Sequence, residues 1–231
     1  MLLDDVASLS KIQIYHKIFT IIHIQLDKDY HPDKKVYGEL LAKSLRFKQY
    51  TDPFLFRACL DQLEDAQFAI NSFWNYGLQT DSEDFGEMYL RIYGLLNAAY
   101  LQAGVVIDLM KLFEYNKQAA SKRNLKTSQL MQLRNKIASH STSYQNPSDP
   151  TKFEFFRLAQ STIDKWGSRI LIVSFDEQQY FDLRVVLNEF TLIEETILED
   201  VLRLAIQRRQ FKKEAMEDLV TLFNHVSSRP L

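Results

Sequence analysis

The chain has 231 residues, 46% of them hydrophobic and 13% aromatic, which is enough to bury a substantial core. Six Gly and five Pro are few, so composition disfavours a loop-rich all-β fold and favours long helices. The net charge of -2 excludes a body that binds polyanions over its whole surface, and any contact with nucleic acid has to come from a local patch.

Cysteine and hydropathy patterns restrict the setting of the protein. Cys59 is the single cysteine, which excludes an intramolecular disulfide and a cysteine zinc site. No signal-peptide pattern opens the chain and no apolar run reaches membrane-spanning length, so we expect a cytoplasmic protein without membrane contact. His16 and His23 share a helix face without an acidic residue to complete a ligand set, and we expect neither a metal nor a cofactor.

The first half of the chain reads as helices. Apolar residues recur at helical spacing over residues 3–26, and a second helix is expected over about 36–50. Thr51-Asp52-Pro53 predicts the start of a third helix, which Gly77 ends. The longest helix is expected over about 84–115, where small residues among the apolar ones allow another helix to approach closely.

A basic stretch and a short helix follow. Residues 116–126 are polar and are expected to form a linker, whose cations are either solvated or guide RNA toward the next helix; they are Lys117, Lys122, Arg123 and Lys126. Thr127 or Ser128 predicts the cap of a short helix through Leu130, Leu133 and Ile137. Ser, Thr, Asn, Asp and Pro over residues 141–150 place His140 at or just beyond the end of that helix.

The periodicity then changes. Residues 152–160 and 169–175 are rich in Phe, Ile, Leu and Val, and with the intervening residues 164–167 they predict a β-hairpin. Helix returns near Leu183 and runs to about residue 206, with a helical tail to about 226. The sequence therefore predicts a mainly α fold, a helical bundle with a small β-hairpin insertion before the last long helix. We expect one domain over 1–231, with an N-terminal helical extension at 1–80 and the hairpin insertion at 151–183.

The functional candidates lie at residues 133–140, Leu-Arg-Asn-Lys-Ile-Ala-Ser-His. Metal-free RNA cleavage by the 2′-hydroxyl needs groups that exchange protons and a positive charge beside the phosphate, which His140 and Arg134 can supply. A structural role is also open, because a cation near a helix C-terminus is stabilised by the helix dipole. On an ideal α-helix the two side chains point about 120° apart. His140 must then lie beyond the regular helix, or a second subunit must complete the site.

This motif, on a short helix after a long one that contains Tyr-Leu-Arg-Ile-Tyr-Gly-Leu-Leu-Asn-Ala at residues 89–98, resembles the HEPN superfamily. The resemblance implies an all-α, metal-independent endoribonuclease, often part of a toxin–antitoxin or phage-defence system. It also implies a homodimer in which the motif helices pair around one cleft. By the same resemblance Arg134 binds the scissile phosphate, His140 is the acid/base and Asn135 orients the site. RNA is the expected substrate, and an antitoxin or regulatory protein is a possible partner.

Three further residues are candidates for substrate binding. Glu87 is favoured over Glu83 and Asp84 as an acidic residue facing the Arg134 cleft, and the alternative is that these charges are solvated at the helix start, where the helix dipole stabilises them. Tyr144 offers a ring for stacking on a base, and Lys136 adds a cation within the motif. Thr142 stands where one branch of the superfamily has a tyrosine that accepts a nucleotide, so inactivation by that route is not expected. The alternatives are a non-catalytic HEPN module for dimerisation and nucleotide or protein binding, or a helical scaffold in which the motif is accidental.

Overall fold

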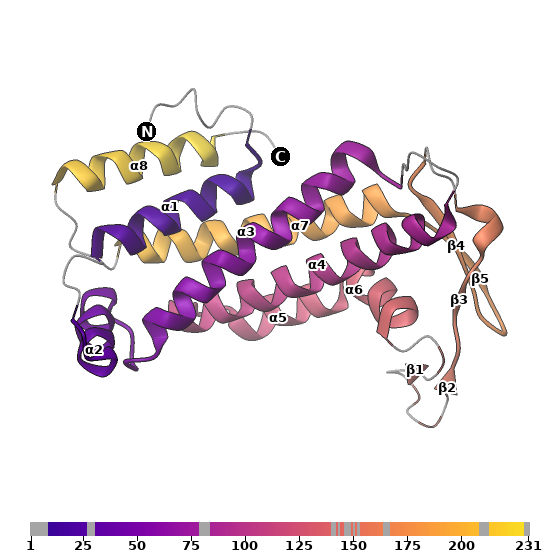
Figure 1. Ribbon diagram of the computed structural model, residues 1–231, viewed down its shortest axis with the longest axis horizontal. Coiled ribbons are helices and arrows are strands. Elements are labelled where there is room, and N and C mark those ends of the chain that lie inside the picture. Colours follow the sequence, from indigo (N-terminus) through magenta and orange to yellow (C-terminus); the bar gives the residue numbers. More distant parts are fainter. Residues whose placement is uncertain are drawn as a thin grey trace. The chain divides into compact units, whose positions relative to one another are not determined.

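The computed structural model of the chain (Figure 1) describes residues 9–26, 31–78, 84–139, 142, 144–145, 149, 151, 153–163, 167–207 and 213–228. The described part is mainly α-helical with two small β-sheets, which confirms the predicted fold class. Contacts divide the chain into two compact units. Unit 1 comprises Met1–Asp65, Gly104–Ser121 and Glu194–Leu231, and unit 2 comprises Ala66–Ala103 and Lys122–Ile193. The unit boundaries fall inside helices rather than in linkers.

The helices of unit 1 begin and end at local signals. Helix α1 spans Lys11–Leu26 and α2 spans Lys34–Leu45. Asp33 caps α2, because its Oδ1 accepts hydrogen bonds from the backbone N–H groups of Lys35 and Val36 at 2.8 and 3.2 Å. Arg46 ends α2 in the left-handed conformation, with φ of 52°, so the helix is shorter than predicted.

Helix α3 spans Asp52–Tyr76, and its start after Thr51 agrees with the predicted signal. Its end also agrees: Gly77 has φ of +58° and donates its N–H to the Phe73 carbonyl at 2.7 Å. The left-handed backbone conformation at this position favours glycine, which has no Cβ to clash with the backbone.

Aromatic rings fill the core of unit 1. Phe56 lies at the centre, with ring centroids of three other phenylalanines 5.5 to 6.0 Å away, those of Phe19, Phe47 and Phe113. Each of these contacts is edge-on, the arrangement that the ring quadrupoles favour. At the edge of this core Tyr15 donates its hydroxyl to Glu199 of α7 (Leu183–Gln207) at 3.2 Å.

In unit 2 the first part of α4 (Phe85–Leu112) packs its apolar face inward, with Ile92, Leu96 and Ala99 fully buried. Gln102 on the same helix is also fully buried, and its amide donates to the Gln67 side chain of α3 at 2.9 Å. Helix α4 is long and apolar enough to cross a membrane by length and mean hydropathy of 1.3, and 56% of the apolar stretch is buried inside the protein.

The prediction of a linker over residues 116–126 is wrong, because most of these residues form a helix. Helix α5 spans Gln118–Thr127, most of it in unit 2. The stretch is rich in Ala, Lys, Arg and Gln, all good helix formers, and contains no Gly or Pro. Leu125 is fully buried and Ser121 nearly so. Because only these two residues form the buried face, the surrounding polar residues gave no helical apolar pattern from which to predict the helix.

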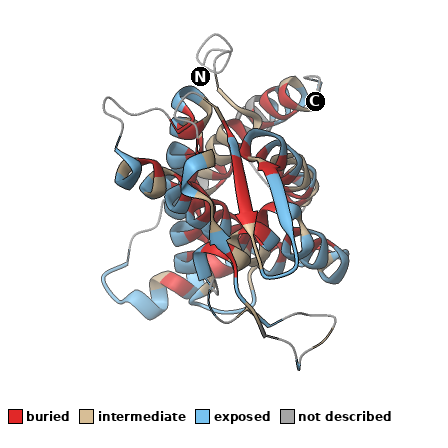
Figure 2. Cartoon of the chain, turned by 90° about the vertical axis from the view of Figure 1, so that its right-hand side faces the viewer, coloured by how far each residue is buried: buried red, intermediate tan, exposed pale blue. Residues whose placement is uncertain are grey.

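The β insertion lies in unit 2 and has more strands than predicted. Strands β3 (Arg157–Leu158), β4 (Arg169–Val173) and β5 (Gln178–Asp182) form an antiparallel sheet in that order, and β1 (Tyr144–Gln145) pairs with β2 (Phe153–Glu154). The predicted pairing of the two apolar runs is present as β3 against β4, with Leu158 opposite Ile172. Strand β5 was not predicted because it is mostly polar; Figure 2 shows it exposed beside the buried β4.

The chain then returns to helix. Helix α7 begins at Leu183, as predicted, and the Asp182 carboxylate accepts from the Arg184 backbone N–H at 3.0 Å. The last helix, α8, spans Lys213–Ser227 in unit 1, where it packs on α1.

Candidate functional site

The motif lies on α6 (Gln129–Arg134) and on the π-helix Asn135–Ser139 that continues it in unit 2. Of the two predicted caps, Thr127 and Ser128, the structure uses Ser128, whose hydroxyl accepts from the Met131 backbone N–H at 3.4 Å. Leu130, Leu133 and Ile137 are buried and anchor this segment. The predicted apolar face is therefore confirmed, while His140 lies outside the described residues.

The π-helix changes the geometry expected for the motif. Its hydrogen bonds run from residue i to i+5, so each residue turns the chain by less than the 100° of an α-helix. The angle of about 120° between the side chains of Arg134 and His140 was calculated for an α-helix. All five residues between them, Asn135–Ser139, form a π-helix instead, so that angle does not apply. Single π-turns of this kind recur at functional sites, where they re-aim side chains.

Arg134 is held by two neighbours. The guanidinium carbon lies 4.0 Å from the centre of the Tyr100 ring of α4, and Nη1 donates to the Asn135 side-chain oxygen at 3.2 Å. Arg134 is half-buried, and no carboxylate among the described residues forms an ion pair with it. The structure thus brings two predicted site residues together and leaves several guanidinium donors for another acceptor.

Tyr100 was missed as a site residue. The helical pattern assigned it to the apolar face of the long helix, but its side chain is 48% exposed and forms a platform under Arg134. A cation over an aromatic ring is worth about 0.5–1 kcal/mol at an exposed site, and more where water is excluded. Its position between the buried Leu96 and Ala103 gave no sequence signal for this role.

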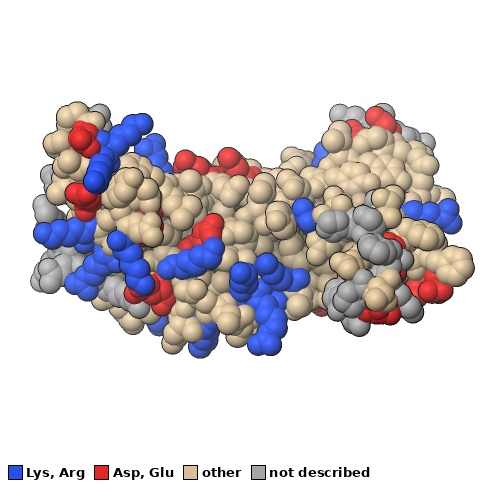
Figure 3. Space-filling view, turned by 90° about the horizontal axis from the view of Figure 1, so that it is seen from below, with Lys and Arg blue, Asp and Glu red and all other residues tan. Residues whose placement is uncertain are grey.

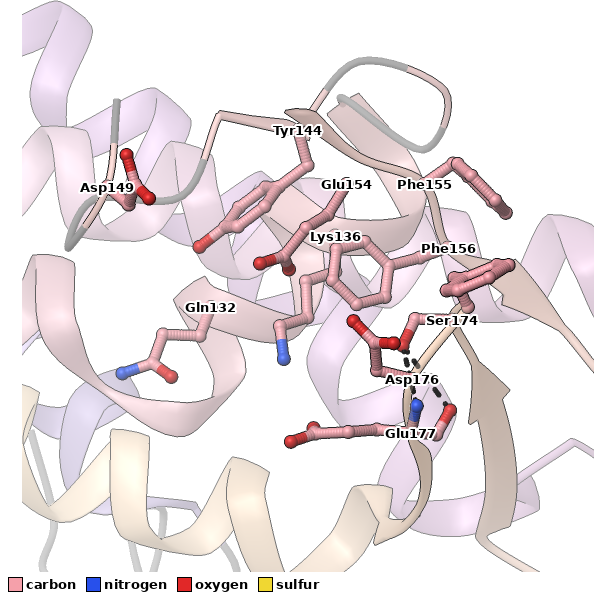
Figure 4. Close-up of a pocket in the computed structure, with 11 residues that line it drawn as sticks. Gln132, Lys136, Tyr144, Asp149, Glu154, Phe155, Phe156, Ser174, Asp176 and Glu177 are labelled. Atoms are coloured by element: carbon pink, nitrogen blue, oxygen red, sulfur yellow. Dashed lines mark hydrogen bonds between the residues drawn. The ribbon is translucent and has the colours of Figure 1, made fainter. Parts of the chain in front are cut away.

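Lys136 of the motif and Tyr144 of β1 both line a pocket of about 510 Å³ (Figure 4), apart from the cluster around Arg134. Lys136 Nζ is 4.9 Å from the centre of the Phe156 ring, and the Tyr144 ring meets the same ring edge-on at 5.3 Å. Burial, with a smaller contribution from Glu154, raises the pKa of Tyr144. Arg134 does not line this pocket.

The pocket is acidic and aromatic. One lysine faces four carboxylates, those of Asp149, Glu154, Asp176 and Glu177, and Phe155, Phe156 and Phe175 also line it. Asp176 and Glu177 belong to the turn between β4 and β5, which Ser174 closes by accepting from the Glu177 N–H at 3.1 Å. Such a lining disfavours a phosphate and favours a cationic group.

Glu87 is engaged elsewhere. Its carboxylate accepts from Arg91 Nε at 3.2 Å, one turn further along α4. The structure therefore divides the candidates: Arg134 and Asn135 form one cluster with Tyr100, Lys136 and Tyr144 belong to the pocket, and Glu87 pairs within its own helix. Within the described ranges no group of three or more His, Cys, Asp or Glu side chains is placed to hold a metal ion.

Comparisons of the chain with family models, with curated proteins and with solved structures found no match.

Proposed function

We propose that the protein is a metal-independent endoribonuclease of the HEPN type, acting in the cytoplasm as part of a toxin–antitoxin or phage-defence system. The resemblance of residues 89–98 and 133–140 to that superfamily supports the proposal. The observation that carries it is the setting of Arg134, a half-buried guanidinium held by Tyr100 and Asn135 directly before a π-turn. No carboxylate among the residues that the structure describes forms an ion pair with it. An arginine held in this way suits a phosphate.

The chemistry assigns one role to each motif residue. The 2′-hydroxyl oxygen attacks the adjacent phosphorus and loses its proton, and the bond from phosphorus to the 5′-oxygen breaks as that oxygen gains a proton. His140 exchanges these protons, since a histidine titrates near neutral pH. Arg134 stabilises the charge on the phosphorane, and Asn135 holds the guanidinium. The products are a 2′,3′-cyclic phosphate, or the 3′-phosphate that its hydrolysis gives, and a 5′-hydroxyl.

The proposal includes a homodimer through the motif helices, in which both Arg–His sets share one cleft. Exposed apolar side chains on the unit 2 part of α4, the helix that also carries Tyr100, support it: Leu90 is 71% exposed, Tyr93 40% and Leu101 36%. A surface of this kind is often covered by another protein chain. Sedimentation or light scattering of the purified protein should give the mass of a dimer, and a monomer at high concentration would contradict this part of the proposal.

The test of the nuclease is cleavage of total RNA or tRNA in EDTA. The wild-type protein is expected to cut, whereas Arg134→Ala and His140→Ala are not, and an exposed variant such as Lys34→Gln on α2 should cut like the wild type. If the wild type does not cut, or if all variants cut alike, the proposal fails.

A second function, a non-catalytic HEPN module that binds a protein partner, is favoured by one observation, the acidic aromatic pocket beside Lys136. It suits a basic side chain better than a nucleotide phosphate. Full-length protein that is inert on RNA, and whose melting temperature rises with an arginine-rich peptide but not with a nucleotide, would support this function instead.

A further inference from the structure

Positive charge is concentrated around the motif. Residues 115–148 contain six Lys or Arg and no Asp or Glu. With -2 for the whole chain, a segment of +6 leaves -8 for the rest. The proposed catalytic arginine therefore lies in a segment of positive net charge within a chain whose remaining residues are net acidic, and an approaching polyanion is attracted to that segment.

Three cations of this segment lie together on one exposed face of α5. Lys122, Arg123 and Lys126 lie on the same side of α5 and are all exposed, while Leu125 and Ser121 are buried on the other. We call these three cations the α5 ridge. In the part of the chain that the structure describes, no carboxylate forms an ion pair with them. Figure 3 shows Lys and Arg side chains gathered on the side where α5 lies.

Lys117, the fourth cation of this run, does not belong to the ridge. It precedes α5 in unit 1, and its Nζ lies 3.8 Å from the Asp200 carboxylate. The structure thus separates a cation with an acidic neighbour from three that have none among the described residues.

The ridge is fixed to the motif helix. The Gln132 amide of α6 donates to the Thr127 carbonyl at the end of α5 at 2.8 Å, and the Ser128 hydroxyl donates to the Leu125 carbonyl at 2.8 Å. These bonds cross the junction between the helices, so the ridge and the segment that ends at Arg134 are joined without a linker. A polyanion on the ridge is therefore bound to the helix that leads directly into α6.

We propose that the α5 ridge binds the phosphodiester backbone of the RNA substrate and leads it to Arg134; this rests on the proposed function and names a second contact surface for the same substrate. The ridge carries no aromatic side chain, so it contacts phosphates rather than bases. The carboxylates around Lys136 repel a phosphate on the pocket side of the motif. The RNA backbone therefore runs over α5 and not through the pocket.

The test measures binding separately from cleavage, with a fluorescent single-stranded 2′-O-methyl RNA that lacks the attacking hydroxyl. The variant Lys122→Gln/Arg123→Gln/Lys126→Gln removes the ridge and keeps good helix formers. The matched control, Lys34→Gln/Lys35→Gln/Lys43→Gln, removes the same charge from exposed positions of α2. Circular dichroism and melting temperature verify that both variants fold.

Each phosphate contact contributes about 0.7 to the slope of log K against log salt for a single strand. Loss of three contacts should lower that slope by about 2 and weaken binding roughly 10- to 100-fold near 0.1 M salt. The control should retain the wild-type slope and affinity. A poly-glutamate peptide of equal charge should bind much more weakly than the RNA.

Any of four outcomes would overturn the proposal that the α5 ridge binds RNA. They are wild-type protein that does not bind the RNA, a ridge variant whose slope of log K against log salt is unchanged, a control variant that loses as much affinity as the ridge variant, and tighter binding of poly-glutamate than of RNA. The proposed function fails separately. If the wild type cleaves ordinary RNA but the ridge variant binds RNA with full affinity, only the proposed role of the ridge is refuted. If the ridge binds RNA but no cleavage occurs, only the proposed nuclease activity is refuted.

Discussion

Replacement of Glu194 by glutamine should change how the stability of the protein depends on pH. Glu194 lies on α7 and is completely buried, and neither carboxyl oxygen has a hydrogen-bond partner among the described residues. Burial, and to a lesser extent the charge of Glu195, raises the pKa of Glu194 well above its ordinary value of 4.5. The folded protein therefore keeps this carboxyl protonated at pH values where the unfolded chain has ionised it.

The sign of the effect follows from proton linkage. Below pH 4.5 both states bind the proton, and Glu194 contributes its full share of stability. Between 4.5 and the raised pKa only the folded state binds it, so this group removes about 1.4 kcal/mol of unfolding free energy for each unit of pH. That is a large fraction of a typical stability of about 5–15 kcal/mol, and equals roughly 3–6 °C in melting temperature per pH unit.

The assay is denaturant unfolding of wild type and Glu194→Gln, followed by circular dichroism from about pH 4.5 upward. Glutamine has the shape of the protonated acid and does not titrate, so the variant should gain stability over wild type by about 1.4 kcal/mol per pH unit. Glu189→Gln, at an exposed position of the same helix, is the matched control and should run parallel to wild type. Parallel curves for wild type and Glu194→Gln would mean that the folded protein does not retain this proton above the pH at which the unfolded chain loses it.

Two predictions concern packing and one concerns reactivity. A Cβ on Gly38 would lie 2.3 Å from the Tyr50 carbonyl oxygen, so Gly38→Ala should lower the unfolding free energy by about 1–3 kcal/mol. Gly94, with open space around it, is the control, and Gly94→Ala should raise it by about 0.5–1 kcal/mol; opposite signs would contradict both. Burial raises the pKa of Cys59 to about 12, so a thiol reagent near pH 8 should label it only after unfolding, and rapid labelling of folded protein would contradict this.

Local signals made much of the fold predictable. Ser128 as a helix cap, Gly77 as a helix end and Leu183 as a helix start each depend on a few adjacent residues, and the structure agrees with all three. Long-range contacts were harder to predict. Strand β5 has few apolar residues and exists through its pairing with β4, and α5 buries little besides Leu125 on an otherwise polar helix.

The candidate site was predictable as a list of residues but not as an arrangement. Arg134 and Asn135 are in contact, whereas the π-turn that begins at Asn135 has no signal in the sequence. Tyr100 has the spacing of a core residue and became a platform because Arg134 covers its ring. The separation of Lys136 from Arg134 depends on which way each side chain leaves a short helical segment, and proximity in the sequence concealed it. The role of His140 stays a prediction.

The most direct measurement is the chemical identity of the RNA ends after incubation in EDTA. The wild type should give 2′,3′-cyclic phosphate or 3′-phosphate ends with a 5′-hydroxyl, Arg134→Ala and His140→Ala should give none, and no cut should occur where the attacking hydroxyl is 2′-O-methylated. Ends with a 3′-hydroxyl, cleavage beside a 2′-O-methyl group, or full activity of Arg134→Ala would contradict the proposed mechanism.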